Sequence, residues 1–133
     1  MTEPSITIHF DSNGRAFHPG ETISGEYCFD SFPSEEVKAV EVSILWYTDG
    51  KGDTDMAVHD FRRIASDEGE WIDPRRPGSF RTVLPNSPLS YDGAILKLNW
   101  CVRVRAFLGR GKEVVGELPF RLGAVAPAQA TAP

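Results

Sequence analysis

Residues 94–107 read AILKLNWCVRVRAF, and apolar and polar side chains alternate along this stretch almost without interruption. Successive side chains of a β-strand point to opposite faces of a sheet, so a period of two indicates a strand with one buried face. The stretch therefore predicts a long strand that lines a hydrophobic core. The side chains expected in that core are Leu96, Leu98, Trp100, Val102 and Val104.

The same alternation recurs along the chain between turn signals. At Pro19-Gly20, for example, proline fixes φ and glycine accepts a positive φ, which is typical of a tight turn. Seven strands separated by such turns, with no segment of ten or more residues in helical period, predict an all-β, two-sheet antiparallel sandwich of the immunoglobulin-like class. We predict these strands at about residues 5–10, 21–29, 39–47, 56–65, 79–84, 94–107 and 113–122.

Length and composition indicate one globular domain. The chain has 133 residues, of which 41% are hydrophobic and 25% charged, as in ordinary globular proteins. We assign residues 1–122 to the sandwich. The remaining residues, 123–133, are mostly alanine and proline with little to pack, so we expect a disordered tail.

Charge and hydropathy limit the classes of partner and the location that we expect for the protein. The net charge is −5, which disfavours nucleic acid because phosphate contacts need a basic surface. The apolar runs are too short for a transmembrane helix, and the first residues lack the pattern of a signal peptide. We therefore expect a cytoplasmic protein that does not insert into membranes.

Three blocks of sequence carry a family resemblance. The first, residues 17–25, reads FHPGETISG and resembles the "aromatic, Gly-Glu, Ile-x-Gly" entry to an early strand of arrestin-like domains. The second, residues 80–93, reads FRTVLPNSPLSYDG and is similar to their "Phe-x-x-x-Leu-Pro, Pro-x-Ser, Gly" stretch. The alternating strand at residues 98–104 follows in family order. The blocks together span most of residues 5–122.

The resemblance implies an arrestin-like sandwich that acts as a non-enzymatic adaptor or scaffold. Arrestins and their relatives, including bacterial sporulation-control proteins, usually carry two such domains in tandem, whereas this chain has one. A function that needs the cleft between two domains is therefore not implied. A protein partner, or a second copy of the chain, is expected to cover the surface that a tandem domain would cover.

Cys28, Trp46 and Cys101 follow the order of the immunoglobulin Cys-Trp-Cys pattern. Parity argues against a disulfide. Cys28 alternates with Tyr27 and Phe29, and Cys101 alternates with Trp100 and Val102, so both thiols should point away from the core between the sheets. We expect two free thiols.

No residue pattern nominates a catalytic or metal site. His9, His18 and His59 have no partner at metal-ligand spacing, and no Gly-x-Ser-x-Gly motif is present. Asp49 to Asp55 resembles a calcium loop, but Lys51 and Thr54 break the EF-hand pattern. We therefore expect no enzyme activity, no cofactor and no catalytic residues.

The solvent-facing rows of the predicted strands are more informative, because exposed aromatic side chains on a strand can mark an interface. The main hypothesis is a protein–protein interaction module that binds through this face or through an open sheet edge. The alternative is a carbohydrate- or calcium-binding sandwich that uses Trp71, Tyr91 and the loop from Asp49 to Asp55. The candidate interaction residues are Leu45, Tyr47, Arg103, Arg105 and Phe107.

Overall fold

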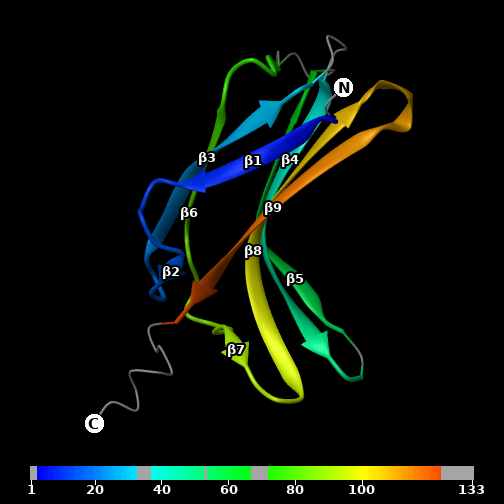
Figure 1. Ribbon diagram of the computed structural model, residues 1–133. Helices are drawn as coiled ribbons and strands as arrows, with labels where there is room; N and C mark the ends of the chain where they lie inside the picture. The colour runs from blue at the N-terminus through cyan, green and yellow to red at the C-terminus, as the bar shows by residue number, and fades with distance from the viewer. Residues whose placement is uncertain (1–2, 33–36, 53, 67–71, 124–133) are drawn as a thin grey trace.

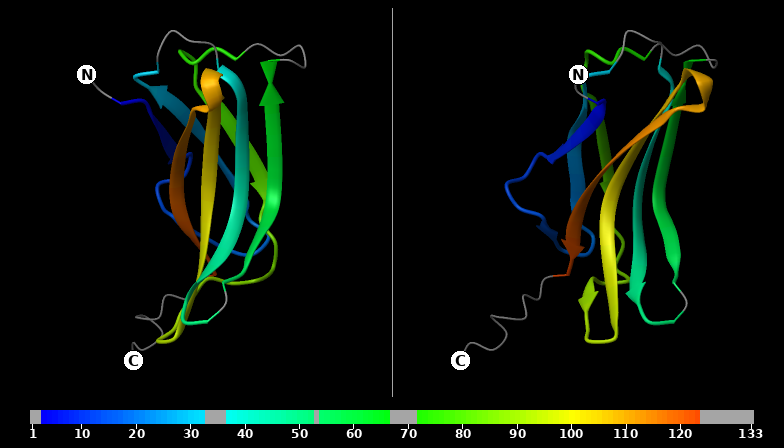
Figure 2. Two further views of the ribbon diagram at one scale, coloured as in Figure 1. Left: turned by 90° about the vertical axis from the view of Figure 1, so that its right-hand side faces the viewer. Right: turned by 45° about the vertical axis from the view of Figure 1, so that its right-hand side comes forward.

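The computed structural model describes residues 3–32, 37–52, 54–66 and 72–123. The described residues form nine strands in two sheets that pack face to face (Figures 1 and 2). The all-β sandwich predicted from the alternating pattern is confirmed. The larger sheet extends past the smaller one at the end where β7 (Tyr91–Asp92) lies (Figure 1). These residues include no helix long and apolar enough to cross a membrane.

The smaller sheet has the order β1-β3-β6, and all its pairings are antiparallel. Each strand falls where alternation predicted one, to within two residues. Pro19-Gly20 forms the predicted turn before β3, with Gly20 at a φ of 82° and the Glu21 N–H donating to the His18 carbonyl over 3.0 Å. The strands span Ser5–Phe10 (β1), Thr22–Asp30 (β3) and Gly78–Val83 (β6).

The larger sheet has the order β2-β9-β8-β4-β5, and β7 pairs with β8. Its four long strands are antiparallel, and they span Val37–Gly50 (β4), Met56–Ala65 (β5), Leu96–Leu108 (β8) and Glu113–Leu122 (β9). Two short strands were not expected from the sequence: Ala16–Phe17 (β2), which pairs parallel with β9, and Tyr91–Asp92 (β7).

One hydrophobic core fills the space between the sheets. Trp100, Val102 and Val104 of β8 are almost fully buried in it, as their alternation predicts. Ile6 and Ile8 from β1 and Ile23 from β3 pack against them from the smaller sheet. Aromatic rings close one end through edge-to-face contacts among Phe10, Phe17 and Phe120, with ring centroids 5.3–6.0 Å apart.

One side of the sandwich is open between the edges of β5 and β6. Within the described ranges, a single hydrogen bond joins the two edges, between His59 Nε2 and the Val83 carbonyl at 2.8 Å. The His59 ring also lies edge-on to Trp100, with centroids 6.2 Å apart. The edge of β5 therefore remains available on the side away from β4.

Both cysteines are free thiols that lie away from the core between the sheets. Cys28 is partly exposed on β3, where it pairs with Thr7, and Cys101 is buried on β8. The predicted placement on alternate faces is therefore confirmed. The predicted tail, residues 124–133, lies outside the described residues.

Candidate interaction surface

The outward face of the larger sheet is organised in rows that cross its four long strands. Strand pairing places Leu45 beside Val58 on one side and beside Cys101 on the other, and Cys101 beside Pro119. These four residues form an apolar band, the name used for them below. Exposed Phe61 pairs with Ser43 in the next row.

Leu45 was predicted as a contact residue, and the structure corrects this expectation. It lies on the outward face, as its parity requires, but is only 1% exposed. Cys101 beside it is 2% exposed. Both lie in central strands of the sheet, with a paired strand on either side. The centre of the apolar band is therefore a buried layer beneath the surface.

Arg103, Arg105 and Phe107 lie where the sequence predicted, but the arginines already have partners. Arg103 Nε donates to Glu117 over 2.6 Å, and Arg105 donates to both carboxylate oxygens of Glu113 at 2.9 Å. The Arg105 guanidinium also lies 5.3 Å from the centre of the Phe107 ring. This end of the face therefore presents neutralised ion pairs and not a basic patch.

Tyr47 is the predicted contact residue that remains next to the apolar band. It is partly exposed, and it pairs with exposed Met56 of β5 and with Asn99 of β8. Burial, followed by the nearby Cys101, Glu117 and Asp49, raises the pKa of its hydroxyl. The Tyr47 side chain thus carries no charge at neutral pH, in keeping with its apolar surroundings.

The most exposed apolar side chains of this face lie on β5, and sequence reasoning missed them. Met56 is 57%, Val58 46% and Phe61 54% exposed. The register shifts between Ile44 and Leu45, because β5 carries an extra residue there, and this bulge interrupts the period of two. The sequence signal was the run of apolar residues at 56, 58 and 61. We call Met56, Val58, Phe61 and Tyr47 the β5 surface.

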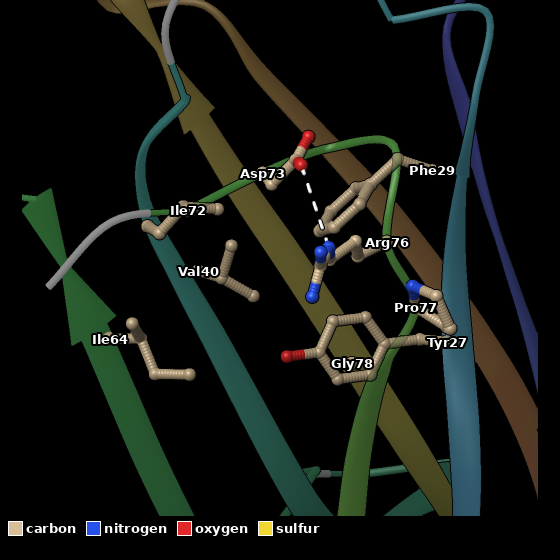
Figure 3. Close-up of a pocket in the computed structure, with 9 residues that line it drawn as sticks. All are labelled: Tyr27, Phe29, Val40, Ile64, Ile72, Asp73, Arg76, Pro77 and Gly78. Carbon is tan, nitrogen blue, oxygen red and sulfur yellow. Dashed lines mark ion pairs between the residues drawn. The ribbon is translucent and has the colours of Figure 1, made fainter.

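A pocket of about 360 Å³ opens between the sheets near the other end of β5 (Figure 3). Its apolar lining includes Phe29, Val40 and Ile64, and an ion pair of 3.8 Å joins Asp73 to Arg76 at its side. Burial raises the pKa of the Tyr27 hydroxyl in this lining, and nearby Arg62 opposes the shift. The volume is at the low end for small-molecule sites, and the described lining offers no nucleophile–base pair.

The described residues contain no cluster of three or more His, Cys, Asp or Glu side chains suited to a metal ion. Of the residues in the sugar- or calcium-binding alternative, Trp71 and Asp53 lie outside the described residues. Tyr91 is 58% exposed on β7, which pairs with β8 beside the end of β4 that carries Asp49. Tyr91 and Asp49 therefore lie at the same end of the larger sheet.

Comparison with known proteins gives a fold and no family. No family model and no curated protein matches the chain. Its structure is similar to that of Spo0M, a sporulation control protein from Bacillus subtilis, with a TM-score of 0.62 and 12% identity over 94% of this chain. The match covers 51% of Spo0M, so this chain spans about half the length of that protein.

The structure is also similar to a superoxide reductase (neelaredoxin) from Ignicoccus hospitalis, with a TM-score of 0.52 and 10% identity. That match covers 89% of this chain and 80% of the reductase. At such low identity, both likenesses establish a shared β-sandwich fold alone. One neighbour is named for a control function and the other for an enzyme, so the fold does not decide between these classes.

Proposed function

We propose that the chain is a non-enzymatic protein-interaction module of arrestin-like type, and that the β5 surface is its contact region. The observation that carries the proposal is the line of half-exposed apolar side chains, Met56, Val58 and Phe61, along an edge strand. Large exposed apolar groups that adjoin one another on a folded domain are typical of binding surfaces.

The surroundings of the β5 surface support the same proposal. Leu45 and Cys101 are buried in the sheet next to the β5 surface. Ion pairs flank this surface: Arg63 binds Glu41 at 3.1 Å, and Arg103 binds Glu117. An apolar centre with a polar margin is the usual anatomy of a protein interface. The likeness to Spo0M, whose fold is arrestin-like, agrees with a regulatory binding module.

Position-specific photocrosslinking tests the proposal. A photoreactive amino acid replaces Phe61 in one chain and Val115 in a second, and both chains are irradiated in the native cells. Val115 is a matched control site because it is 44% exposed on the outward face at β9, away from β5. We expect defined protein adducts from position 61 and few from position 115.

A substitution in the same experiment separates the surface from general stickiness. Val58→Asp places a charge in the β5 surface and should abolish the adducts formed from position 61. Val115→Asp makes the same chemical change at similar exposure and should leave them unchanged. Equal adduct yields from both positions, or adducts from position 61 that survive Val58→Asp, would show that β5 is not the contact region.

A further inference from the structure

β5 is the edge strand of the larger sheet, and its charge pattern is complementary to itself. It pairs with β4 on one side, and no described strand pairs with the other. Residues 56–63 are all exposed. The free backbone N–H and C=O groups of such an edge are a template for another strand. The side chains of β5 then decide which strand fits.

Asp60 and Arg62 set that preference. They pair with Ile44 and Val42 of β4, which face the core, so both charges lie on the inward side of β5. Phe61 lies between them and points outward beside Ser43. Neither charge takes part in the ion pairs found among the described residues. Inward-pointing charges on an edge strand exclude strands that cannot match them.

A second copy of β5 matches them in one register. Antiparallel pairing about a twofold axis at Phe61 places Asp60 of each copy opposite Arg62 of the other. Opposite charges directly across a ladder are favourable, and like charges are unfavourable. Over the stretch from Asp60 to Arg62, which follows the bulge, the outward faces of both copies lie on one side only if the register moves in steps of two. The nearest such shifts place Asp60 opposite Asp60, or Arg62 opposite Arg62.

We propose that two copies of this chain associate through β5 in this register, so that their larger sheets join into one continuous sheet. The inference rests on the proposed function, because it names the partner of the same surface. Phe61 then contacts its counterpart across the axis on the outward face. The contact is isologous, so it closes at a dimer.

Charge exchange on the purified chain tests the proposal, with the mass in solution measured by light scattering and sedimentation over a concentration series. We expect the unaltered chain to dimerise. Asp60→Arg leaves two arginines opposite each other across the axis, and Arg62→Asp leaves two aspartates opposite each other. Each should weaken the dimer by about tenfold or more. An equimolar mixture of the two variants should regain dimerisation. In the heterodimer, the two arginines of one variant lie opposite the two aspartates of the other, so both cross-axis pairs are of opposite charge.

The double variant Asp60→Arg/Arg62→Asp should also dimerise, because both cross-axis pairs are again of opposite charge, and it tests the register if either single variant fails to fold. Glu26→Arg is the matched control, since it replaces an acidic side chain by arginine at an exposed position of β3 in the smaller sheet and should leave the dimer unchanged. Circular dichroism checks folding.

A chain that stays monomeric at every concentration would overturn the inference, as would single variants that dimerise normally or a double variant that does not recover. The outcomes also separate the two proposals. If the chain is monomeric and position 61 still crosslinks another protein in cells, the dimer proposal is wrong and the proposal of a binding module stands. A chain that stays monomeric and gives no position-dependent adducts removes the proposed partner-binding function as well.

Discussion

Position 25 illustrates how closely the strands approach one another in the smaller sheet. Gly25 pairs with Phe10 on one side and with Phe80 on the other. A Cβ atom there would collide with the His9 carbonyl oxygen and lie 2.7 Å from Cζ of Phe80. Glycine is therefore required by space rather than by backbone angle.

We expect Gly25→Ala to lower the free energy of unfolding by about 1–3 kcal/mol, because the added methyl forces backbone and ring to move. Urea denaturation followed by circular dichroism measures the change. Gly109→Ala is the matched control, since a Cβ at that position meets no atom within 4 Å, and its effect should stay within about 0.5 kcal/mol. Similar losses for both variants would contradict the packing argument.

The thiol of Cys101 links stability to pH. Burial, with a smaller effect of Glu117, raises its pKa from the ordinary value of 9.0 to about 11, and Arg103 acts in the opposite sense. The folded chain thus holds this proton at pH values where the unfolded chain has lost it. We expect the contribution of this thiol to stability to be complete below pH 9 and to be lost as the pH rises through about 11.

Unfolding by urea at a series of pH values, in the unaltered chain and in Cys101→Ala, measures that contribution. The decline in the free energy of unfolding above pH 9 should be shallower in the variant, because the variant lacks the thiol whose raised pKa causes part of it. Parallel declines would show that Cys101 carries no linkage. Below that pH, the two proteins should differ by a constant amount.

At the scale of elements, Trp100 ties β8 to the loop that precedes β7. Its indole N–H donates to the Pro88 carbonyl over 2.8 Å, and its ring is buried in the core. We expect Trp100→Phe to cost about 1–3 kcal/mol of unfolding free energy, through the lost hydrogen bond and the space left behind. Chemical denaturation followed by circular dichroism reads this value.

Trp46→Phe is the matched control for this prediction. Trp46 pairs directly with Trp100 across β4 and β8, is only partly buried, and has no side-chain hydrogen bond among the described residues. Its replacement should cost clearly less. An equal cost at both positions would show that ring volume, and not the tie to Pro88, sets the energy.

The sequence predicted the elements whose pattern is local. β1, β4, β8 and β9 follow from alternation alone, because one face of each lies against a continuous core. β2 and β7 have two residues each and depend on partners distant in the chain, so no local signal marks them. The candidate contact residues were predicted around Leu45, which the structure shows to be buried. Alternation reports which face a side chain takes and not how fully its neighbours cover it.

At the scale of the whole molecule, both sheets share one core, and distant segments pair. β2 pairs with β9, and β1 also packs against β9. We expect unfolding to be a single cooperative transition in which tryptophan fluorescence and circular dichroism coincide. Refolding should take milliseconds to seconds, since ladders between distant strands form slowly. Stopped-flow refolding checks the rate, and separate transitions for the two probes would indicate that the sheets unfold independently.

The pairing of β2 with β9 has a consequence for the chain as it leaves the ribosome. The Arg121 N–H donates to the Arg15 carbonyl, and the Gly123 N–H to the Phe17 carbonyl, so the first strands are completed by nearly the last residues described. Translation of the intervening hundred or so residues takes roughly 5–20 s. For that interval, the apolar rows of the nascent N-terminal segment that pack against β9 are uncovered, and this surface can aggregate until β9 is made.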